Sequence, residues 1–470
     1  ESKIKLMSFL KIKNLSVDYK MRRETINAAK NVNIDVSKGE ILGLVGESGS
    51  GKSTVGNAII NLIDEPGRVS NGSIVLDGID IHADAQNIVK YRGKKIGLIF
   101  QDPQTSLNPI LTIGEQLIET IQTHLNLNAD DAKNKAINLL KEVGIKDAET
   151  RFDNYPHQFS GGMRQRVVIS LALCCEPELL IADEPTTALD VTIQAQILQL
   201  MNELRAELNM SLLLITHDLG VVANMADEVV VAYHGKVVES GPVSEIFNDP
   251  QHPYLVALMR AVPQVGLDSS QRLTPIREVP HQNLDTHIKK EPWPESAEQL
   301  GPLLRVSNIV KTFATRSSGM FKSSEGVKIR AVEDVSLYIQ RGECLGLVGE
   351  SGCGKTTLSK IIMRALNPDS GQITYNDRGK LVSLLDLSGE ELIDFRKKIQ
   401  FIFQDPFSSL NPRMTVFDII SEPLVIHNIG DRKGREGIVK DLMGQVGLDP
   451  RFLSRYPHSF SGGQRQRVAL

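Results

Sequence analysis

Five short apolar runs recur at long intervals in the first half of the chain, at residues 41–45, 96–100, 179–182, 212–215 and 229–232. Helical stretches separate them. Continuous apolar runs of this kind are typical of strands buried on both faces of a parallel sheet. Two earlier segments, 10–19 and 28–36, alternate between apolar and polar residues in the manner of edge strands. The pattern therefore predicts an α/β fold.

A glycine-rich loop lies between the first apolar run and a predicted helix at 55–63. It fits the pattern G-x-x-x-x-G-K-[S/T], which is typical of a phosphate-binding loop. The glycines let backbone N–H groups turn inward around a triphosphate, and the positive end of the next helix adds to them. We expect Lys52 to reach the β- and γ-phosphates and the Ser53 hydroxyl to bind Mg²⁺. The nucleotide-binding residues predicted here are Gly46, Ser48, Gly49, Gly51, Lys52, Ser53 and Thr54.

The glycine-rich sequence of this loop has two alternative interpretations. A chance glycine-rich turn is possible once but is improbable in two copies. A dinucleotide fingerprint fails because Thr54 stands where that motif needs a small residue. The second copy follows a strand-like run at 344–348, and its predicted nucleotide-binding residues are Gly349, Ser351, Gly352, Gly354, Lys355, Thr356 and Thr357.

Other motifs recur in the same register, which indicates a tandem duplication. The sequence at 101–103 repeats at 404–406, and Ser160-Gly161-Gly162 repeats as Ser461-Gly462-Gly463. We expect one domain at 7–262, a linker at 263–302 and a second domain at 303–470. The linker is proline-punctuated and polar, and a packed extension is the alternative to it. The second copy stops just past Gly463, so we expect a fragment whose natural chain continues for roughly 70 residues or more, enough for the missing αβ units.

The apolar run at 179–182 ends in two adjacent carboxylates. Because side chains alternate along a strand, Asp183 and Glu184 meet different neighbours. This suits Asp183 to Mg²⁺ and Glu184 to the water that attacks the γ-phosphate. A helix-capping acid is the structural alternative for either residue.

Two further polar residues follow buried strands, where ligands sit in parallel sheets. Gln101 is expected near Mg²⁺ and the attacking water, and His217 near the γ-phosphate. Tyr19 and Phe313 precede the two phosphate loops and could stack on adenine, although an aromatic residue of the strand core is an almost equal alternative for each.

The Ser160-Gly161-Gly162 segment opens the helix that continues into 167–175 and forms a second anion-binding end. A simple serine N-cap is the alternative. It can reach bound phosphates only from a facing domain, so we expect composite sites. One joins Lys52, Ser53, Gln101, Asp183, Glu184 and His217 to Ser461-Gly462-Gly463. The other joins Lys355, Thr356 and Gln404 to Ser160-Gly161-Gly162. The predicted Mg²⁺ ligands are Ser53, Gln101, Asp183, Thr356 and Gln404.

Composition narrows the function. Lys and Arg number 53 against 57 Asp and Glu, a net charge of −4, so the balance gives no reason to expect nucleic acid as a partner. The cysteines, Cys174, Cys175, Cys344 and Cys353, suit neither a disulfide framework nor zinc, so we expect no zinc, no iron–sulfur cluster and a reducing, cytoplasmic setting. No apolar run is long enough to span a bilayer.

Taken together, the motifs resemble the nucleotide-binding domain of the ABC ATPase superfamily, in the order phosphate loop, glutamine loop, Ser-Gly-Gly signature, Asp-Glu pair and switch histidine. The segments 155–166, 186–192 and 252–254 look like the peptide and nickel importer branch. The resemblance implies two P-loop NTPase domains of ABC type in tandem, the second incomplete at its C-terminus. It also implies an ATPase that uses ATP and Mg²⁺.

By the same resemblance, the partners are two membrane permeases and, indirectly, a solute-binding protein, with the chain peripheral at the inner face of the cell membrane. The helical insert at 106–155 is expected to receive a permease coupling helix. Two alternatives are a soluble tandem ATPase acting on ribosomes or DNA and half of an exporter. The first calls for a charged helical linker or zinc modules, and the second for attached membrane helices. The solute cannot be read from the ATPase.

Overall fold

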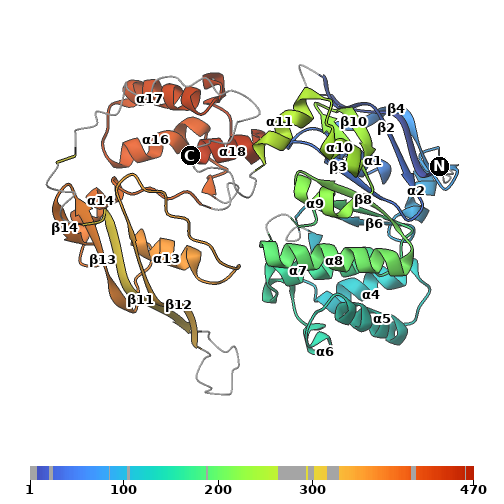
Figure 1. The fold of residues 1–470 in the computed structure, drawn as a ribbon, viewed down its shortest axis with the longest axis horizontal. Helices are drawn as coiled ribbons and strands as arrows, with labels where there is room; N and C mark the ends of the chain where they lie inside the picture. The colour runs from blue at the N-terminus through green and yellow to red at the C-terminus, as the bar shows by residue number, and fades with distance from the viewer. Residues whose placement is uncertain are drawn as a thin grey trace. The chain divides into compact units, whose positions relative to one another are not determined.

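The computed structural model describes residues 8–20, 25–83, 85–102, 106–186, 189–262, 293–294, 301–314, 328–403, 409–460 and 462–470. The chain divides into two units, Glu1–Glu278 and Val279–Leu470, coloured blue to green and yellow to red in Figure 1. Most of the predicted linker lies outside the described residues. Within it, the Trp293 ring centroid lies 5.1 Å from the guanidinium carbon of Arg341 in the second unit.

A six-stranded sheet forms the centre of the first unit, in the order β10-β9-β3-β8-β7-β6. The five predicted strands are all present and parallel to their neighbours among these five. They are β3 (Ile41–Val45), β6 (Ile96–Ile99), β7 (Leu179–Asp183), β8 (Ser211–Thr216) and β9 (Glu228–Tyr233). Only β10 (Lys236–Pro242), at one edge, runs antiparallel. Every residue of β3, β7 and β8 is buried, which explains their continuous apolar sequence.

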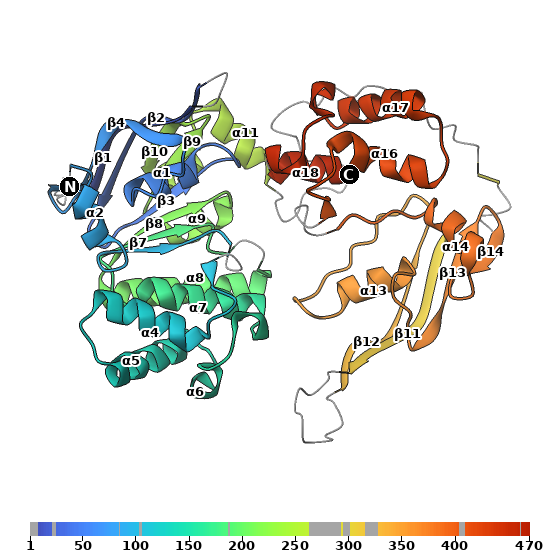
Figure 2. The same cartoon turned by 180° about the vertical axis from the view of Figure 1, so that it is seen from behind.

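Alternate residues of these strands pack into different hydrophobic clusters. Leu180 and Leu212 join helices on one face, including α7 (Gly161–Leu173) and α8 (Val191–Leu208). Ile181 and Leu213 join α1 (Lys52–Ile59) and an antiparallel sheet on the other. The parallel sheet is therefore covered on both sides, as Figure 2 shows from behind.

The antiparallel sheet has the order β2-β1-β4-β5. Its strands are β1 (Ser8–Lys20), β2 (Thr25–Ser37), β4 (Gly67–Leu76) and β5 (Ile79–Asp80). The edge prediction is correct for β2 but wrong for β1, which pairs with β2 and β4. An antiparallel strand with one solvent face alternates wherever it lies in the sheet, so alternation does not identify an edge.

The insert at 106–155 is helical, as predicted. It contains α4 (Ile113–His124), α5 (Ala129–Glu142) and α6 (Ala148–Arg151), and the 3₁₀ turn η1 (Pro156–Gln158) leads from it to α7. A capping box between Thr112 and Glu115 starts α4. Further helices in the described part of this unit are α2 (Ala85–Tyr91), α9 (Leu219–Met225), α10 (Val243–Asn248) and α11 (Pro253–Ala261).

The second unit repeats the antiparallel sheet in the order β12-β11-β13-β14. These strands are β11 (Leu304–Ala314), β12 (Lys328–Ile339), β13 (Ser370–Asp377) and β14 (Lys380–Ser383). Helices among its described residues include α13 (Lys355–Ile362), α14 (Gly389–Arg396), α16 (Val416–Ile426), α17 (Arg432–Gln445) and α18 (Gly462–Ala469), with the 3₁₀ turns η3 (Pro450–Phe452) and η4 (Pro457–Ser459).

The strand predicted at 344–348 is absent. These residues form no ladder, and Val348 is 94% exposed. In the first unit the corresponding strand, β3, is held between β8 and β9. No described residue of the second unit pairs with 344–348, so an apolar sequence alone does not make a strand there.

Candidate ATP-binding and hydrolysis site

The loop between β3 and α1 has the backbone geometry of a phosphate cradle. Gly51, which precedes α1, has a φ of 96°, and a Cβ atom there would lie 2.2 Å from the carbonyl oxygen of Ala28. A Cβ on Gly46 would meet the carbonyl oxygen of Ala232 at 2.2 Å. Both positions therefore require glycine. Ser48 and Gly49 are exposed at the tip of the loop, while Ser53 and Thr54 open α1 and are half-buried.

Lys52 is folded back beneath this loop. Its Nζ donates hydrogen bonds to the carbonyl oxygens of Gly46 and Glu47, both at 2.8 Å. The side chain is buried, and burial lowers the pKa of Lys52, although the carboxylates of Glu184 and Asp183 act in the opposite direction. The ammonium group is thus held against the backbone carbonyl groups at the start of the loop.

Asp183 ends β7 beside the start of α1. Burial raises the pKa of its carboxyl group, and a hydrogen bond from the Ser53 hydroxyl opposes that shift. The Oδ1 atom of Asp183 is buried and has no hydrogen-bond partner in the described part of the chain. A buried carboxylate oxygen without a partner next to a serine hydroxyl fits a hard cation such as Mg²⁺.

The Glu184 carboxylate contacts both Gln101 and His217, the two other residues predicted for this site. Nε2 of Gln101 donates to its Oε2 at 2.9 Å, and Nδ1 of His217 lies 2.9 Å from its Oε1. The contact with Glu184 raises the pKa of His217, and partial burial and the charge of Lys52 oppose it. The carboxyl ends of β6, β7 and β8 therefore bring Gln101, Glu184 and His217 together.

The signature serine caps its own helix. The Ser160 Oγ accepts a hydrogen bond from the Met163 N–H at 3.3 Å, so the N-cap alternative describes the structure correctly. This does not exclude anion binding, because the hydroxyl proton stays available to a phosphate oxygen. A Cβ atom on Gly161 would meet nothing within 4 Å, which leaves this end of α7 open, whereas one on Gly162 would lie 2.9 Å from Ile193.

The second loop repeats the first in its lysine contacts. Lys355 Nζ donates to the carbonyl oxygens of Gly349 and Glu350, both at 2.6 Å, and Gly354 takes a φ of 98° before α13. Thr356 and Thr357 open α13, and Ser351 and Gly352 are exposed at the tip. Gly462 and Gly463 begin α18. Gln404 and Ser461 lie outside the described residues.

The two candidate adenine-stacking residues are placed differently from one another. Tyr19 is half-buried near the end of β1, paired with Gly67 and packed against the hydrophobic cluster. Phe313 is 41% exposed near the end of β11, with Lys311 Nζ 5.9 Å from its ring centroid. Phe313 is therefore partly exposed, whereas Tyr19 packs against the core.

A family profile described as ABC transporter matches residues 29–187 and 332–470. The chain belongs to the ABC transporter family. Its members bind and hydrolyse ATP, so the chain is an ABC-type ATPase built from two P-loop domains in tandem.

Relatives of this ABC ATPase are found along nearly its whole length. It is 42% identical over 468 residues to the glutathione import ATP-binding protein GsiA of Pectobacterium atrosepticum, covering 98% of this chain and 74% of that protein. It is 43% identical over 474 residues to the protein of the same name from Escherichia coli K12, with the same coverage. A solved dimeric ATP-binding cassette with ADP and phosphate aligns with 50% of this chain and 98% of its own, at 32% identity and a TM-score of 0.46.

Sequence reasoning missed a residue that supports the phosphate loop of the ABC ATPase site. The Tyr254 hydroxyl accepts a hydrogen bond from the Glu47 N–H in the phosphate loop at 2.9 Å, and its ring stacks on Tyr233 with centroids 4.1 Å apart. Tyr254 is 207 positions away from Glu47 in sequence. Its place in the His-Pro-Tyr segment at the start of α11 was the available signal.

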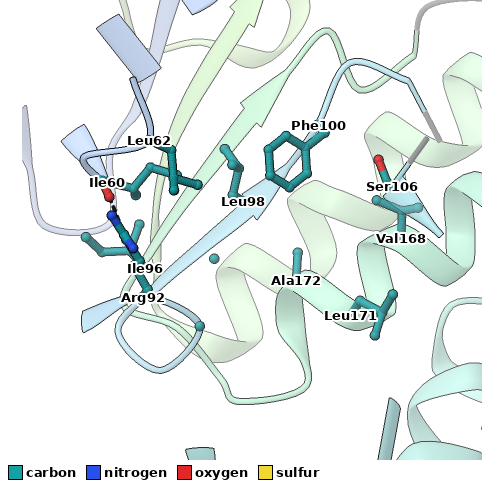
Figure 3. Close-up of a pocket in the computed structure, with 12 residues that line it drawn as sticks. Ile60, Leu62, Arg92, Ile96, Leu98, Phe100, Ser106, Val168, Leu171 and Ala172 are labelled. Atoms are coloured by element: carbon teal, nitrogen blue, oxygen red, sulfur yellow. Dashed lines mark hydrogen bonds between the residues drawn. The ribbon is translucent and has the colours of Figure 1, made fainter. Parts of the chain in front are cut away.

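A pocket of about 220 Å³ lies at the outer edge of β6. Figure 3 shows Leu62, Leu98, Phe100, Val168 and Leu171 around it. Phe100, directly before Gln101, is 45% exposed, and Leu62 is 41% exposed. Among the described residues, no helix is long and apolar enough to cross a membrane.

Proposed function

We propose that this chain is the ATP-hydrolysing subunit of an importer for peptides or related small solutes. The observation that carries the catalytic part is the Glu184 carboxylate, which is held between Gln101 and His217 beside the phosphate loop. The import part rests on relatives that are named as glutathione import ATP-binding proteins. In this role the chain works at the inner, cytoplasmic face of the cell membrane, with two permeases and, through them, a solute-binding protein.

The proposed reaction is an in-line attack on ATP. The loop N–H groups and Lys52 hold the β- and γ-phosphates, and the Glu184 carboxylate orients a water molecule and accepts its proton. The water oxygen then bonds to the γ-phosphorus as the bond to the β,γ-bridging oxygen breaks, which yields ADP and phosphate. Gln101 helps to hold that water, and His217 contacts the γ-phosphate.

Ser53, Asp183 and Gln101 are the residues that would hold Mg²⁺. The unpartnered Oδ1 of Asp183 beside the Ser53 hydroxyl supports this set. Bound Mg²⁺ supplies charge neutralisation for the β- and γ-oxygens. In the second half, Thr356 and Gln404 take the equivalent roles. Neither zinc nor an iron–sulfur cluster has a part in this proposal.

The two halves close head to tail around ATP in this scheme. Ser461-Gly462-Gly463 completes the site of Lys52, and Ser160-Gly161-Gly162 completes the site of Lys355. The open helix end at Gly161 and the free hydroxyl proton of Ser160 support this use.

The apolar pocket beside β6 is the proposed docking site of a permease coupling helix. Exposed apolar surface next to polar residues is typical of interaction sites. Because Phe100 directly precedes Gln101, an occupant of the pocket would act on the residue that holds Glu184. Movement of the permease could thereby be linked to hydrolysis.

Replacing Glu184 tests the catalytic assignment. Glu184→Gln keeps the shape of the side chain but removes the charge that draws on the water, so we expect ATP turnover with Mg²⁺ to fall by roughly 10²-fold or more. Nucleotide binding should persist. Steady-state phosphate release by the purified chain measures this, and near-normal turnover would remove Glu184 as the base.

Site-directed cross-linking tests the docking site. A photoreactive maleimide on Ser106→Cys, at the pocket, should label the permeases in membranes. The matched control is Ser240→Cys on β10, an exposed position at the opposite edge of the sheet. Both are made in a background with the exposed Cys344 and Cys353 replaced by serine. Labelling from position 240 alone would refute the docking site.

A further inference from the structure

Glu184 leaves the sheet in an unusual backbone conformation. Strand β7 ends at Asp183, and Glu184 has a φ of 48°, in the left-handed region that residues with side chains seldom occupy. Such a conformation persists when the surrounding structure fixes it. The Glu184 N–H donates to the Ile215 carbonyl oxygen at 2.8 Å. This hydrogen bond fixes the peptide group on the N-terminal side of Glu184.

The backbone on the C-terminal side of Glu184 is held by a glutamine from another element. Nε2 of Gln165, on α7, donates to the carbonyl oxygen of Pro185 at 2.5 Å. Gln165 is 2% exposed, so its amide is committed inside the protein. Pro185 is itself buried, and its carbonyl follows Glu184 directly, where no ladder of β7 continues. The amide of Gln165 therefore supplies a hydrogen bond that the sheet no longer provides.

We propose that Gln165 is a positioning residue that holds Glu184 in its hydrolytic geometry. It acts through the Pro185 peptide rather than by touching ATP. The duplication carries a parallel, because Gln466 follows Gly463 by the same spacing at which Gln165 follows Gly162.

The position of Gln165 also links Glu184 to the signature segment. It lies in the first turns of α7, and the Ser160-Gly161-Gly162 signature forms the N-terminal end of the same helix. In the proposed head-to-tail arrangement that signature binds the nucleotide of the opposite site. A rotation or shift of α7 on phosphate binding would then reach Glu184 through one hydrogen bond. This inference rests on the proposed function, in which Glu184 is the base.

Removal of the donor with little change of shape tests the inference. Gln165→Met keeps an unbranched side chain of similar size but cannot donate to the Pro185 carbonyl, and Gln165→Glu places an acceptor there. Misplacement of a catalytic group by about 1 Å can cost 10²-fold in rate. In the full chain we expect kcat for ATP to fall by roughly tenfold or more in both variants, with KM and nucleotide affinity within about twofold of wild type.

Gln199→Met, at an exposed position on α8, is the matched control and should leave both constants unchanged. Turnover remaining in Glu184→Gln is subtracted first as activity that does not use this base. A Gln165→Met protein with kcat within twofold of wild type would overturn the inference, as would a loss confined to KM or a loss matched by the fraction unfolded at the assay temperature. If Glu184→Gln retains normal turnover, the proposed function fails instead, whatever the Gln165 variants do.

Discussion

His217 carries the clearest electrostatic signature in the site. Its contact with Glu184 raises its pKa above the ordinary value of 6.5, so replacement of that carboxylate should lower the pKa again. We expect Glu184→Gln to move the His217 titration to lower pH. NMR of histidine-labelled protein measures this titration, and the signal that disappears in His217→Gln identifies His217. An unchanged titration would show that the pair does not form in solution.

The raised pKa of His217 also determines how its contribution to folding stability changes with pH. A raised pKa in the folded state means that the contribution of His217 is complete below its unfolded pKa of about 6.5 and is lost as pH rises through the folded value. The difference in melting temperature between wild type and His217→Gln should therefore be largest in mild acid and shrink above neutrality. The side chain is 57% exposed, so this difference should be small.

Individual residues differed in how far the sequence revealed them. Gln101, Asp183, Glu184 and His217 could be predicted to meet because parallel strands place their carboxyl ends at one edge. Tyr254 and Gln165 could not, because each acts by a single hydrogen bond to a distant backbone atom. Such a contact leaves no periodic pattern in the sequence, and only the His-Pro-Tyr segment marked Tyr254.

At the scale of elements, the phosphate loop depends on glycines for two separate reasons, conformation and space. Gly51→Ala would place a Cβ 2.2 Å from the Ala28 carbonyl oxygen at a positive φ, so we expect a loss of roughly 1–3 kcal/mol in unfolding free energy and weaker ATP binding. Gly161→Ala is the control, because a Cβ there meets nothing within 4 Å.

Because alanine is the better helix former, Gly161→Ala should be neutral or slightly stabilising, by up to about 1 kcal/mol. The unfolding transition of the first unit in denaturant gives the unfolding free energy of both variants. Equal losses in the two would mean that the crowding at Gly51 relaxes without consequence.

The helices and strands could be predicted where burial on both faces of a sheet made the apolar pattern strong. The five strands of the central sheet are the best example. The failure at 344–348 has a physical cause, because strand formation depends on neighbours that a local window does not contain. The position of β1 inside its sheet was missed for the same reason: alternation reports which face is buried and nothing about pairing.

For the whole molecule, the proposed head-to-tail closure can be tested with a native thiol. Cys353 occupies in the second loop the place of Ser50 in the first, and it is exposed. If Ser160-Gly161-Gly162 completes the site of Lys355, then Ser160→Cys should form a disulfide with Cys353 under mild oxidation, more readily with ATP bound. Gel mobility and peptide mass spectrometry detect it.

Cys353→Ser in the same variant should abolish this cross-link, whereas Cys344→Ser should leave it intact. If the cross-link forms between two chains and never within one, each composite site is shared between molecules rather than between the halves of one chain.

The two phosphate loops share their lysine contacts although only the first follows a strand. Each loop leans on a nearby antiparallel strand, with Gly51 against Ala28 and Gly354 against Ala331. Contacts this close in sequence form fast, whereas parallel pairing between distant strands is slow. We expect the first loop to take its shape early during synthesis, before β6, β7, β8 and β9 have been translated, so that nucleotide present in the cell can act as a folding ligand for the rest of that domain.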